Sequence, residues 1–425
     1  MIYRCMSHLF KSYCFKGYRY MGKVVFSALI TLLVLYSVTN ASSVKLDKKD
    51  IAAAITSNAK ENRFPNILSI ADVENARVQY TFSSSLHQDM ANVYLQYQPD
   101  YACFVAIDVE TGAILNLTSF VKSDEEWENL VLRAAYPAAS VFKLITAAAA
   151  IDSNEVTPET IIPFNGKSTT LYKNQVFKHK TNKWTRTPTF KESFAKSINP
   201  VFARIGARQL GASKLTDYAS RFGFDTPLQT DFILPTSKIN LDLGTEWALA
   251  EAASGYTRDI TLSPIHAAQM AATVANGGRL VTPYMVNSIT DDRGEILYQS
   301  EPSVDGPQVI SSESAEKLRS LMRETVRIGS ARGSFKDTKR YKVYRDMEIG
   351  GKTGSLTGLS PRGRHDWFVG YAEKNGRKVA YASLIVNKEK WYVRSAYVAR
   401  QFIYHYFTEQ DAKRESEELA NAGER

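Results

Sequence analysis

The alternation of apolar and polar residues predicts paired strands near both ends of the chain. Residues 101–109 form an almost continuous apolar run, and a short turn separates them from a second run at 113–117, which predicts an antiparallel hairpin. Near the carboxyl end, residues 367–372 and 379–386 flank an Asn-Gly pair at 375–376, a strong hairpin signal. The sequence therefore predicts two hairpins that lie far apart along the chain.

Between these hairpins, the apolar residues follow a helical period instead. Helices are expected at 136–151, 193–204, 215–224, 264–276 and 312–326, and an aromatic helix at 397–407 would cover the sheet. This pattern predicts an α+β fold, in which an antiparallel sheet from both ends of the domain is flanked by helices around an all-helical middle.

The expected helix at 136–151 is apolar on every face, which is typical of a helix in the centre of a domain. Lys143 carries the only charge between Arg133 and Asp152. Burial of an unpaired ammonium lowers the lysine pKa until the amine is neutral and can act as a base. Ser140 lies one helical turn earlier, so the pair resembles an activated serine nucleophile. The alternative is a core helix whose lysine reaches its ammonium to the surface.

The spacing Ser-x-x-Lys alone is weak, because it recurs at Ser42, Ser57, Ser119, Ser193 and Ser314. Only the lysine after Ser140 is surrounded by apolar residues. A second candidate cluster, Ser197 and Asn199, provides a hydroxyl and a carboxamide two residues apart. In a bend both would face one cleft, although a helix cap or turn is the simpler interpretation.

The third cluster is the Lys-Thr-Gly sequence at Lys352, Thr353 and Gly354, which occurs once in the chain. Glycines on both sides of the lysine and threonine let a ligand approach the strand backbone closely. The ammonium and the hydroxyl suit a carboxylate. The alternative is a turn on an edge strand with a solvated lysine.

The amino-terminal region has the pattern of an export signal. Five of the nine net positive charges precede an apolar segment at 24–38, with no acid among them. We expect a cleaved signal or a retained membrane anchor, which places residues after 42 outside the cytoplasm; a buried core helix is the alternative. The small net charge of the remaining chain argues against a nucleic-acid partner.

Cysteine and histidine usage predicts neither a disulfide nor a metal site. Cys5 and Cys14 precede the apolar segment, so Cys103 is alone in the exported part. The six histidines show no paired spacing, and we expect no metal and no cofactor.

Residues 160–190 are rich in lysine and arginine and contain no acid. Aromatic residues at Tyr172, Phe177 and Trp184 are interleaved with the cations. Such a segment either binds an anionic polymer or forms a solvated hairpin over the site.

Taken together, the three clusters in this order resemble the signature of penicillin-binding proteins and serine β-lactamases. The resemblance to the penicillin-binding transpeptidase domain extends from about residue 80 to 407. It includes the segments 106–115, 222–224, 261–264, 275–278 and 366–370. Ala139 stands where the family often has glycine, and Ser355 where it often has threonine.

The resemblance implies a role for each matching residue. Ser140 would attack the carbonyl between the two terminal D-alanines of a peptidoglycan stem peptide, and Lys143 would accept its proton. Ser197 would relay a proton to the leaving group, while Asn199 would hold the substrate amide.

The remaining roles that the resemblance implies fall on the Lys-Thr-Gly strand. Lys352 and Thr353 of this motif, which Gly354 completes, would bind the terminal carboxylate. Backbone N–H groups of Ser140 and Ser355 would form the oxyanion hole.

The implied function is that of a serine D,D-transpeptidase, which β-lactams acylate. A D,D-carboxypeptidase, a serine β-lactamase and a non-catalytic envelope sensor of β-lactams or peptidoglycan are the alternatives. The expected organisation is a signal or anchor at 1–41, a spacer at 42–79, the transpeptidase domain at 80–410 and a charged tail at 411–425. The expected location is the cell envelope, either anchored in the inner membrane through 24–38 and facing the periplasm, or free in the periplasm.

Overall fold

The computed structural model describes residues 45–123, 127–178, 180–227, 230–240 and 242–423. The expected signal or anchor at 24–38 lies outside these residues. No helix in the described part of the chain is both long enough and apolar enough to cross a membrane. All elements named below belong to one compact unit, residues 47–425.

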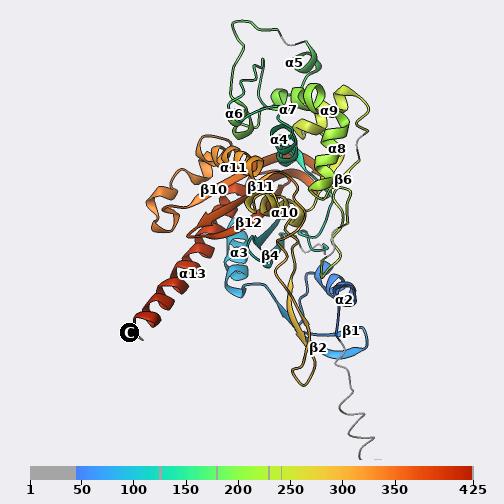
Figure 1. The fold of residues 1–425 in the computed structure, drawn as a ribbon, viewed down its shortest axis with the longest axis vertical. Coiled ribbons are helices and arrows are strands. Elements are labelled where there is room, and N and C mark those ends of the chain that lie inside the picture. The colour runs from blue at the N-terminus through green and yellow to red at the C-terminus, as the bar shows by residue number, and fades with distance from the viewer. Residues whose placement is uncertain (1–44, 124–126, 179, 228–229, 241, 424–425) are drawn as a thin grey trace, which may run out of the picture. The chain divides into compact units, whose positions relative to one another are not determined.

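Strands lie mainly near the two ends of this unit, and helices dominate its middle (Figure 1). The helices are α2 (Lys48–Lys60), α3 (Ser84–Tyr97), α4 (Lys143–Asp152), α5 (Lys173–Phe177), α6 (Phe190–Ala195), α7 (Asn199–Ile205), α8 (Gly211–Arg221), α9 (Glu246–Ser254), α10 (Pro264–Ala275), α11 (Ser312–Arg327), α12 (Arg332–Phe335) and α13 (Ser395–Gly423). Short helical turns are η1 (Ala139–Phe142), η2 (Gly206–Leu210), η3 (Thr338–Arg340) and η4 (Lys342–Tyr344).

The strands form three sheets. They are β1 (Ile67–Ile70), β2 (Val73–Tyr80), β3 (Tyr101–Asp108), β4 (Ile114–Val121), β5 (Tyr136–Pro137), β6 (Lys238–Ile239), β7 (Ile260–Leu262), β8 (Val286–Thr290), β9 (Ile296–Gln299), β10 (Glu348–Leu359), β11 (Arg362–Lys374) and β12 (Arg377–Asn387). Their orders are β10-β11-β12-β3-β4, β1-β2-β8-β9 and β5-β7-β6.

The five-stranded sheet confirms that the two ends of the domain pair with each other. β3 and β4 form the first expected hairpin, and β11 and β12 form the second. Asn375 and Gly376 both have positive φ, 53° and 81°, as a tight two-residue turn requires. β12 pairs with β3 in antiparallel register, with Ala380 opposite Ile107.

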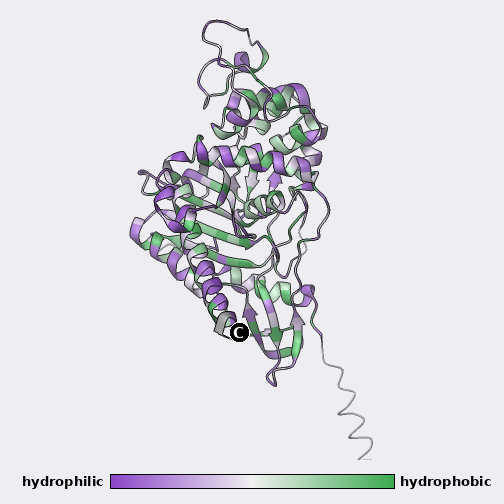
Figure 2. Cartoon of the chain, turned by 60° about the vertical axis from the view of Figure 1, so that its left-hand side comes forward, coloured by the Kyte–Doolittle hydropathy of each residue, from purple (hydrophilic) through white to green (hydrophobic). Residues whose placement is uncertain are grey.

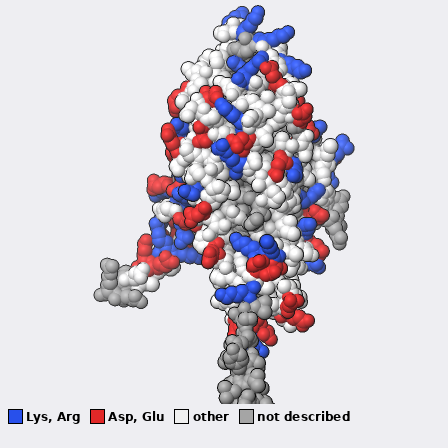
Figure 3. Space-filling view, turned by 45° about the vertical axis from the view of Figure 1, so that its right-hand side comes forward, with Lys and Arg blue, Asp and Glu red and all other residues white. Residues whose placement is uncertain are grey.

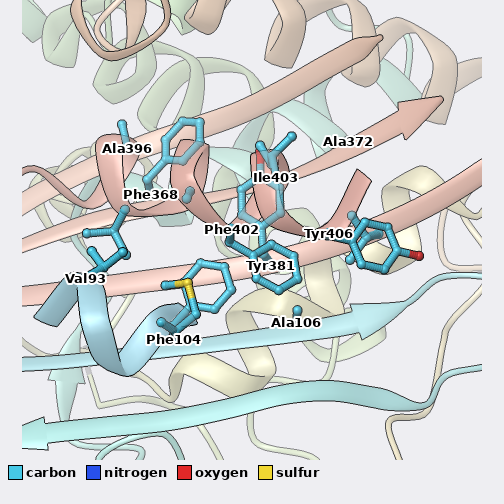
Figure 4. Packing of buried hydrophobic residues seen from close by; sticks show 14 of the residues in the cluster. Val93, Phe104, Ala106, Phe368, Ala372, Tyr381, Ala396, Phe402, Ile403 and Tyr406 are labelled. Atoms are coloured by element: carbon cyan, nitrogen blue, oxygen red, sulfur yellow. The ribbon is translucent and has the colours of Figure 1, made fainter. Parts of the chain in front are cut away.

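Helices cover both faces of this sheet. On one face, α3 and α13 enclose an apolar cluster in which Phe104, Tyr381 and Phe402 are fully buried (Figure 4). The rings of Phe104 and Phe402 lie 4.7 Å apart, so the aromatic helix covers the sheet as predicted. α10 and α11 contact the sheet through β12 and β10. The strands of the sheet are mostly green in Figure 2, as expected for strands buried on both faces.

The helical middle packs around α4. This helix contacts α7, α8 and α9, and every residue from Lys143 to Ile151 is buried, as the all-round apolar pattern predicts. The helix that carries the candidate base Lys143 therefore lies in the interior of the domain.

Two segments contain more regular structure than their composition suggests. The expected spacer includes α2, which starts with a capping box at Asp47, and also β1 and β2. β2 pairs with β8, with Val78 opposite Ile289, so this segment is part of a sheet. At the other end, α13 continues through the charged residues to Gly423. The domain boundaries at 41, 79 and 410 stay predictions.

Candidate active site

Ser140 lies in the turn η1, which precedes the helix rather than belonging to it. The structure corrects the expected continuous helix at 136–151, because β5 takes up Pro137 and α4 begins at Lys143. Ala139 has φ +49°, a left-handed conformation that interrupts helical geometry just before the serine. The indole of Trp367 donates a hydrogen bond to the Pro137 carbonyl at 3.0 Å and so fixes the start of the turn.

The Lys143 amine is enclosed and surrounded by polar partners. Its Nζ lies 2.7 Å from Ser140 Oγ, 2.7 Å from Asn199 Oδ1 and 3.2 Å from Ser197 Oγ. The side chain has no solvent exposure. Burial lowers the pKa of Lys143 well below its usual value, and the nearby Lys352 ammonium lowers it further. The amine is therefore suited to accept the hydroxyl proton of Ser140.

Ser197 and Asn199 lie at a break between two helices. The expected helix at 193–204 is wrong at this point, because α6 ends at Ala195 and α7 begins at Asn199. Ser197 has φ +55°, and this bend brings its hydroxyl and the Asn199 carboxamide to the same amine. The sequence anticipated such a bend as the condition for both groups to face one cleft.

The third cluster lies on the edge strand β10, opposite the serine turn. Lys352 Nζ lies 3.0 Å from Ser197 Oγ and donates a hydrogen bond to the Thr353 carbonyl at 2.8 Å. Burial lowers the pKa of Lys352 to about 7. A Cβ on Gly354 would lie only 3.0 Å from Val141 Cγ2, so glycine permits the strand to approach η1 this closely.

All three clusters open into one cleft of about 900 Å³. Its lining includes Ser140, Ser197, Asn199, Thr353, Gly354 and Ser355. The sequence-predicted residues thus come together from five places in the chain: η1, α4, the α6–α7 bend, α7 and β10. The oxyanion hole formed by the backbone N–H groups of Ser140 and Ser355 stays a prediction.

Three residues that the sequence analysis did not single out support this arrangement. Gly255 ends α9 in a left-handed conformation, and a Cβ there would lie 1.9 Å from the Ala139 carbonyl oxygen. Ser330 and Thr353 form a hydrogen bond between their hydroxyl groups. Arg364 Nε donates to Ser355 Oγ at 2.7 Å. Only Gly255 had a local signal, since glycine is the usual helix C-cap.

The described residues include no group of three or more His, Cys, Asp or Glu that could hold a metal ion. Cys103 is buried in β3.

Residues 102–404 match the family model described as the penicillin binding protein transpeptidase domain. The chain belongs to this family. A peptidoglycan D,D-transpeptidase PbpA from Mycobacterium tuberculosis is 28% identical over 325 residues, which cover 68% of this chain and 63% of that protein. The chain thus spans less than two thirds of the length of this penicillin-binding relative.

Solved structures of penicillin-binding proteins have the same fold. The D,D-transpeptidase domain of a peptidoglycan glycosyltransferase from Eggerthella lenta is similar with a TM-score of 0.65 and 22% identity, over 79% of this chain and 84% of that chain. The imipenem acyl-enzyme complex of penicillin-binding protein A from M. tuberculosis has a TM-score of 0.63 and 25% identity, over 78% and 79%. The α+β fold is therefore the β-lactamase/transpeptidase-like fold of this family.

Proposed function

We propose that this protein is a serine D,D-transpeptidase that acts on peptidoglycan stem peptides through an acyl-enzyme on Ser140. The observation that carries this proposal is the buried Lys143 amine 2.7 Å from Ser140 Oγ. Family membership and the relative named as a peptidoglycan D,D-transpeptidase support the same reaction class.

Acylation begins at the Ser140 hydroxyl. As Oγ attacks the carbonyl between the terminal D-alanines, its proton passes to the neutral Lys143 amine. The Oγ–C bond forms and the carbonyl oxygen becomes an oxyanion, which the N–H groups of Ser140 and Ser355 stabilise. One such donor is worth about 2.7–4 kcal/mol in a preorganised site.

Collapse of this intermediate releases the last D-alanine. Ser197 lies between the amines of Lys143 and Lys352, at 3.2 and 3.0 Å, and passes a proton to the leaving nitrogen. Lys352 and Thr353 hold the terminal carboxylate, and Asn199 holds the substrate amide. An amine from a neighbouring stem then attacks the ester, forms the cross-link and frees Ser140.

The same nucleophile accounts for inhibition by β-lactams. Attack of Ser140 on the strained ring gives an acyl-enzyme that no acceptor amine resolves quickly. The M. tuberculosis protein was solved as such a complex with imipenem, which supports this step for the present chain. The substrate is a polymer of the cell wall, so we place the protein in the cell envelope, with an anchor or cleaved signal at 24–38.

The test is labelling of the full chain with a fluorescent penicillin. We expect covalent label on the wild type and none on Ser140→Ala, because the alanine cannot form the ester. The matched control is Ser334→Ala, which removes a hydroxyl from the same cleft and should leave the label in place. Label on the Ser140→Ala variant would overturn the proposed nucleophile.

Product analysis separates the related activities. A transpeptidase joins two stems and releases D-alanine, whereas a D,D-carboxypeptidase releases D-alanine without joining them. Rapid, repeated hydrolysis of nitrocefin would identify a serine β-lactamase. Acylation without any D-alanine release would identify a sensor.

A further inference from the structure

A second charged surface lies beside the cleft, on the segment 160–190, which we call the basic lobe. Residues 160–191 contain no aspartate or glutamate. Six cations of the lobe are exposed: Lys167, Lys173, Lys178, Lys180, Lys183 and Arg186. Lysine and arginine side chains gather at this end of the molecule, which is uppermost in Figure 3 and carries α5 in Figure 1.

The basic lobe is folded against the helical middle rather than loosely attached. Leu171 and Val176 pack in an apolar cluster with Ala203 and Ala250. Asn165 joins the two sides of the lobe, since its Nδ2 donates to the Lys180 carbonyl at 2.8 Å and its Oδ1 accepts from Thr185 Oγ1 at 2.8 Å. The backbone that carries the cations is therefore anchored to the rest of the domain.

The positive charge of this surface is not neutralised locally. None of the six exposed cations forms an ion pair with another described residue, whereas the adjacent Lys191 pairs with Glu159. Trp184 and Tyr172 are exposed among them, by 74% and 60%. Lys183 Nζ lies 5.2 Å from the centre of the Trp184 ring. A surface with uncompensated cations and flat aromatic rings favours an anionic partner with extended contacts.

The lobe is continuous with the cleft. The Ser168 carbonyl accepts a hydrogen bond from the Asn199 N–H at 2.8 Å, and the Thr169 carbonyl accepts one from Asn199 Nδ2 at 3.0 Å. Thr169 also lines the cleft itself. A polymer whose peptide branch enters the cleft at Asn199 therefore passes the lobe on leaving it.

We propose that the basic lobe binds the peptidoglycan strand through the carboxylates of its stem peptides, outside the catalytic cleft. This inference rests on the proposed function, because that function identifies the polymer in the cleft. The cleft holds one stem for acylation, and the lobe holds carboxylates of adjacent stems along the same polymer. The lobe thereby raises the local concentration of polymeric substrate without contacting the reacting atoms.

The experiment measures binding of soluble, uncross-linked peptidoglycan strands to the full chain carrying Ser140→Ala, which prevents turnover. The test variant is Lys180→Glu with Lys183→Glu. The matched control is Lys45→Glu with Lys49→Glu, the same charge change at two exposed lysines outside the lobe and outside the cleft lining. Strands with amidated carboxylates and vesicles of anionic lipid serve as further probes.

We expect strand affinity to fall at least fivefold in the lobe variant, to stay within twofold in the control and to weaken as salt rises. With amidated strands, the protein with the native lobe and the lobe variant should have equal affinity, because the lobe then has no carboxylate to bind. Equal affinity of lobe and control variants, undiminished binding of amidated strands, or lobe-dependent binding to vesicles alone would each overturn the proposal.

A separate measurement keeps the two hypotheses apart. With Ser140 restored, the lobe variant should react with fluorescent penicillin at the wild-type rate, because Lys180 and Lys183 do not line the cleft. Loss of labelling in the wild type contradicts the proposed function, whereas normal labelling with lobe-independent strand binding contradicts only the lobe proposal.

Discussion

At the scale of single residues, the site contains two buried lysines whose pKa values are lowered to different extents. Lys143 and Lys352 have no exposed surface, and both contact Ser197. Burial lowers the pKa of both amines, and the charge of Lys352 lowers that of Lys143 further. These pKa values suit Lys143 to the proposed role of a neutral base, and Lys352, with a pKa of about 7, to the proposed role of a positive partner for a carboxylate.

The pH dependence of acylation should report on Lys352. Its ammonium form predominates below about pH 7 and is lost as pH rises, so the carboxylate loses its partner. We expect the second-order rate constant for penicillin acylation to fall by up to about tenfold per pH unit on the alkaline side. Stopped-flow measurement across this range provides the profile.

The variant Lys352→Arg gives the control for this profile. A guanidinium stays charged throughout the range, so the alkaline decline should move to higher pH even if the overall rate is lower. A decline at the same pH in both proteins would show that another group titrates.

The identity of these residues was predictable, but their conformation was not. Lys143 could be singled out because it is the only charged residue in a long apolar run, and a run that is apolar on every face predicts that its residues are buried. The partnership of Ser330 with Thr353 joins residues on different elements, and no local pattern indicates it. Sequence reasoning therefore found the residues that meet at the cleft and missed the residues that contact them there.

At the scale of elements, Ser140 and Ser197 both lie in turns beside helices: Ser140 just before α4, and Ser197 between α6 and α7. Ala139 and Ser197 both adopt left-handed conformations, which cost a non-glycine residue on the order of 1–3 kcal/mol each. Packing of the surrounding helices must stabilise these turns. The apolar period continues through both positions, which explains why the sequence predicted unbroken helices there.

Gly255 should be essential for the turn that carries Ser140. In Gly255→Ala, the new Cβ would meet the Ala139 carbonyl oxygen at 1.9 Å and displace the serine. A displacement of about 1 Å in a reacting group can lower a rate on the order of 100-fold. We expect a decrease of that size in penicillin acylation, measured by labelling time courses.

The matched control is Gly376→Ala in the β11–β12 turn. Gly376 also has positive φ, 81°, but no atom lies within 4 Å of its ideal Cβ position. This variant should lose roughly 1–2 kcal/mol of stability from backbone strain and keep the wild-type acylation rate. Equal acylation by the two variants would contradict the steric argument.

At the scale of the whole molecule, the central sheet was easier to predict than the segment before it. Two clear hairpin patterns at 101–117 and 367–386 predicted four of its five strands, whereas neither the fifth strand, β10, nor the strand order followed from them. The strand β2 escaped prediction because it buries only Ala76 and Val78 and so lacks the apolar run that marks the strands of the central sheet. β1 is only four residues long, which is too short for a clear pattern.

Removal of the amino-terminal segment should therefore destabilise the catalytic unit. A chain starting at residue 80 lacks β1 and all but the last residue of β2, and leaves β8 as an unpaired edge with its apolar residues exposed. We expect a lower melting temperature and more aggregation than for a chain starting at residue 45, measured by calorimetry and light scattering. Equal melting temperatures would instead support a spacer at 42–79.

The pairing of β3 with β12 also limits how early the central sheet can form while the chain is being synthesised. The hairpin of β3 and β4 emerges from the ribosome early, but its neighbour Arg377–Asn387 is among the last parts to be made. Until then an apolar strand edge has no partner, and pairing of such distant segments is slow. We therefore expect chaperones to shield the apolar edge of β3 from the time this strand is made until β12 has been made.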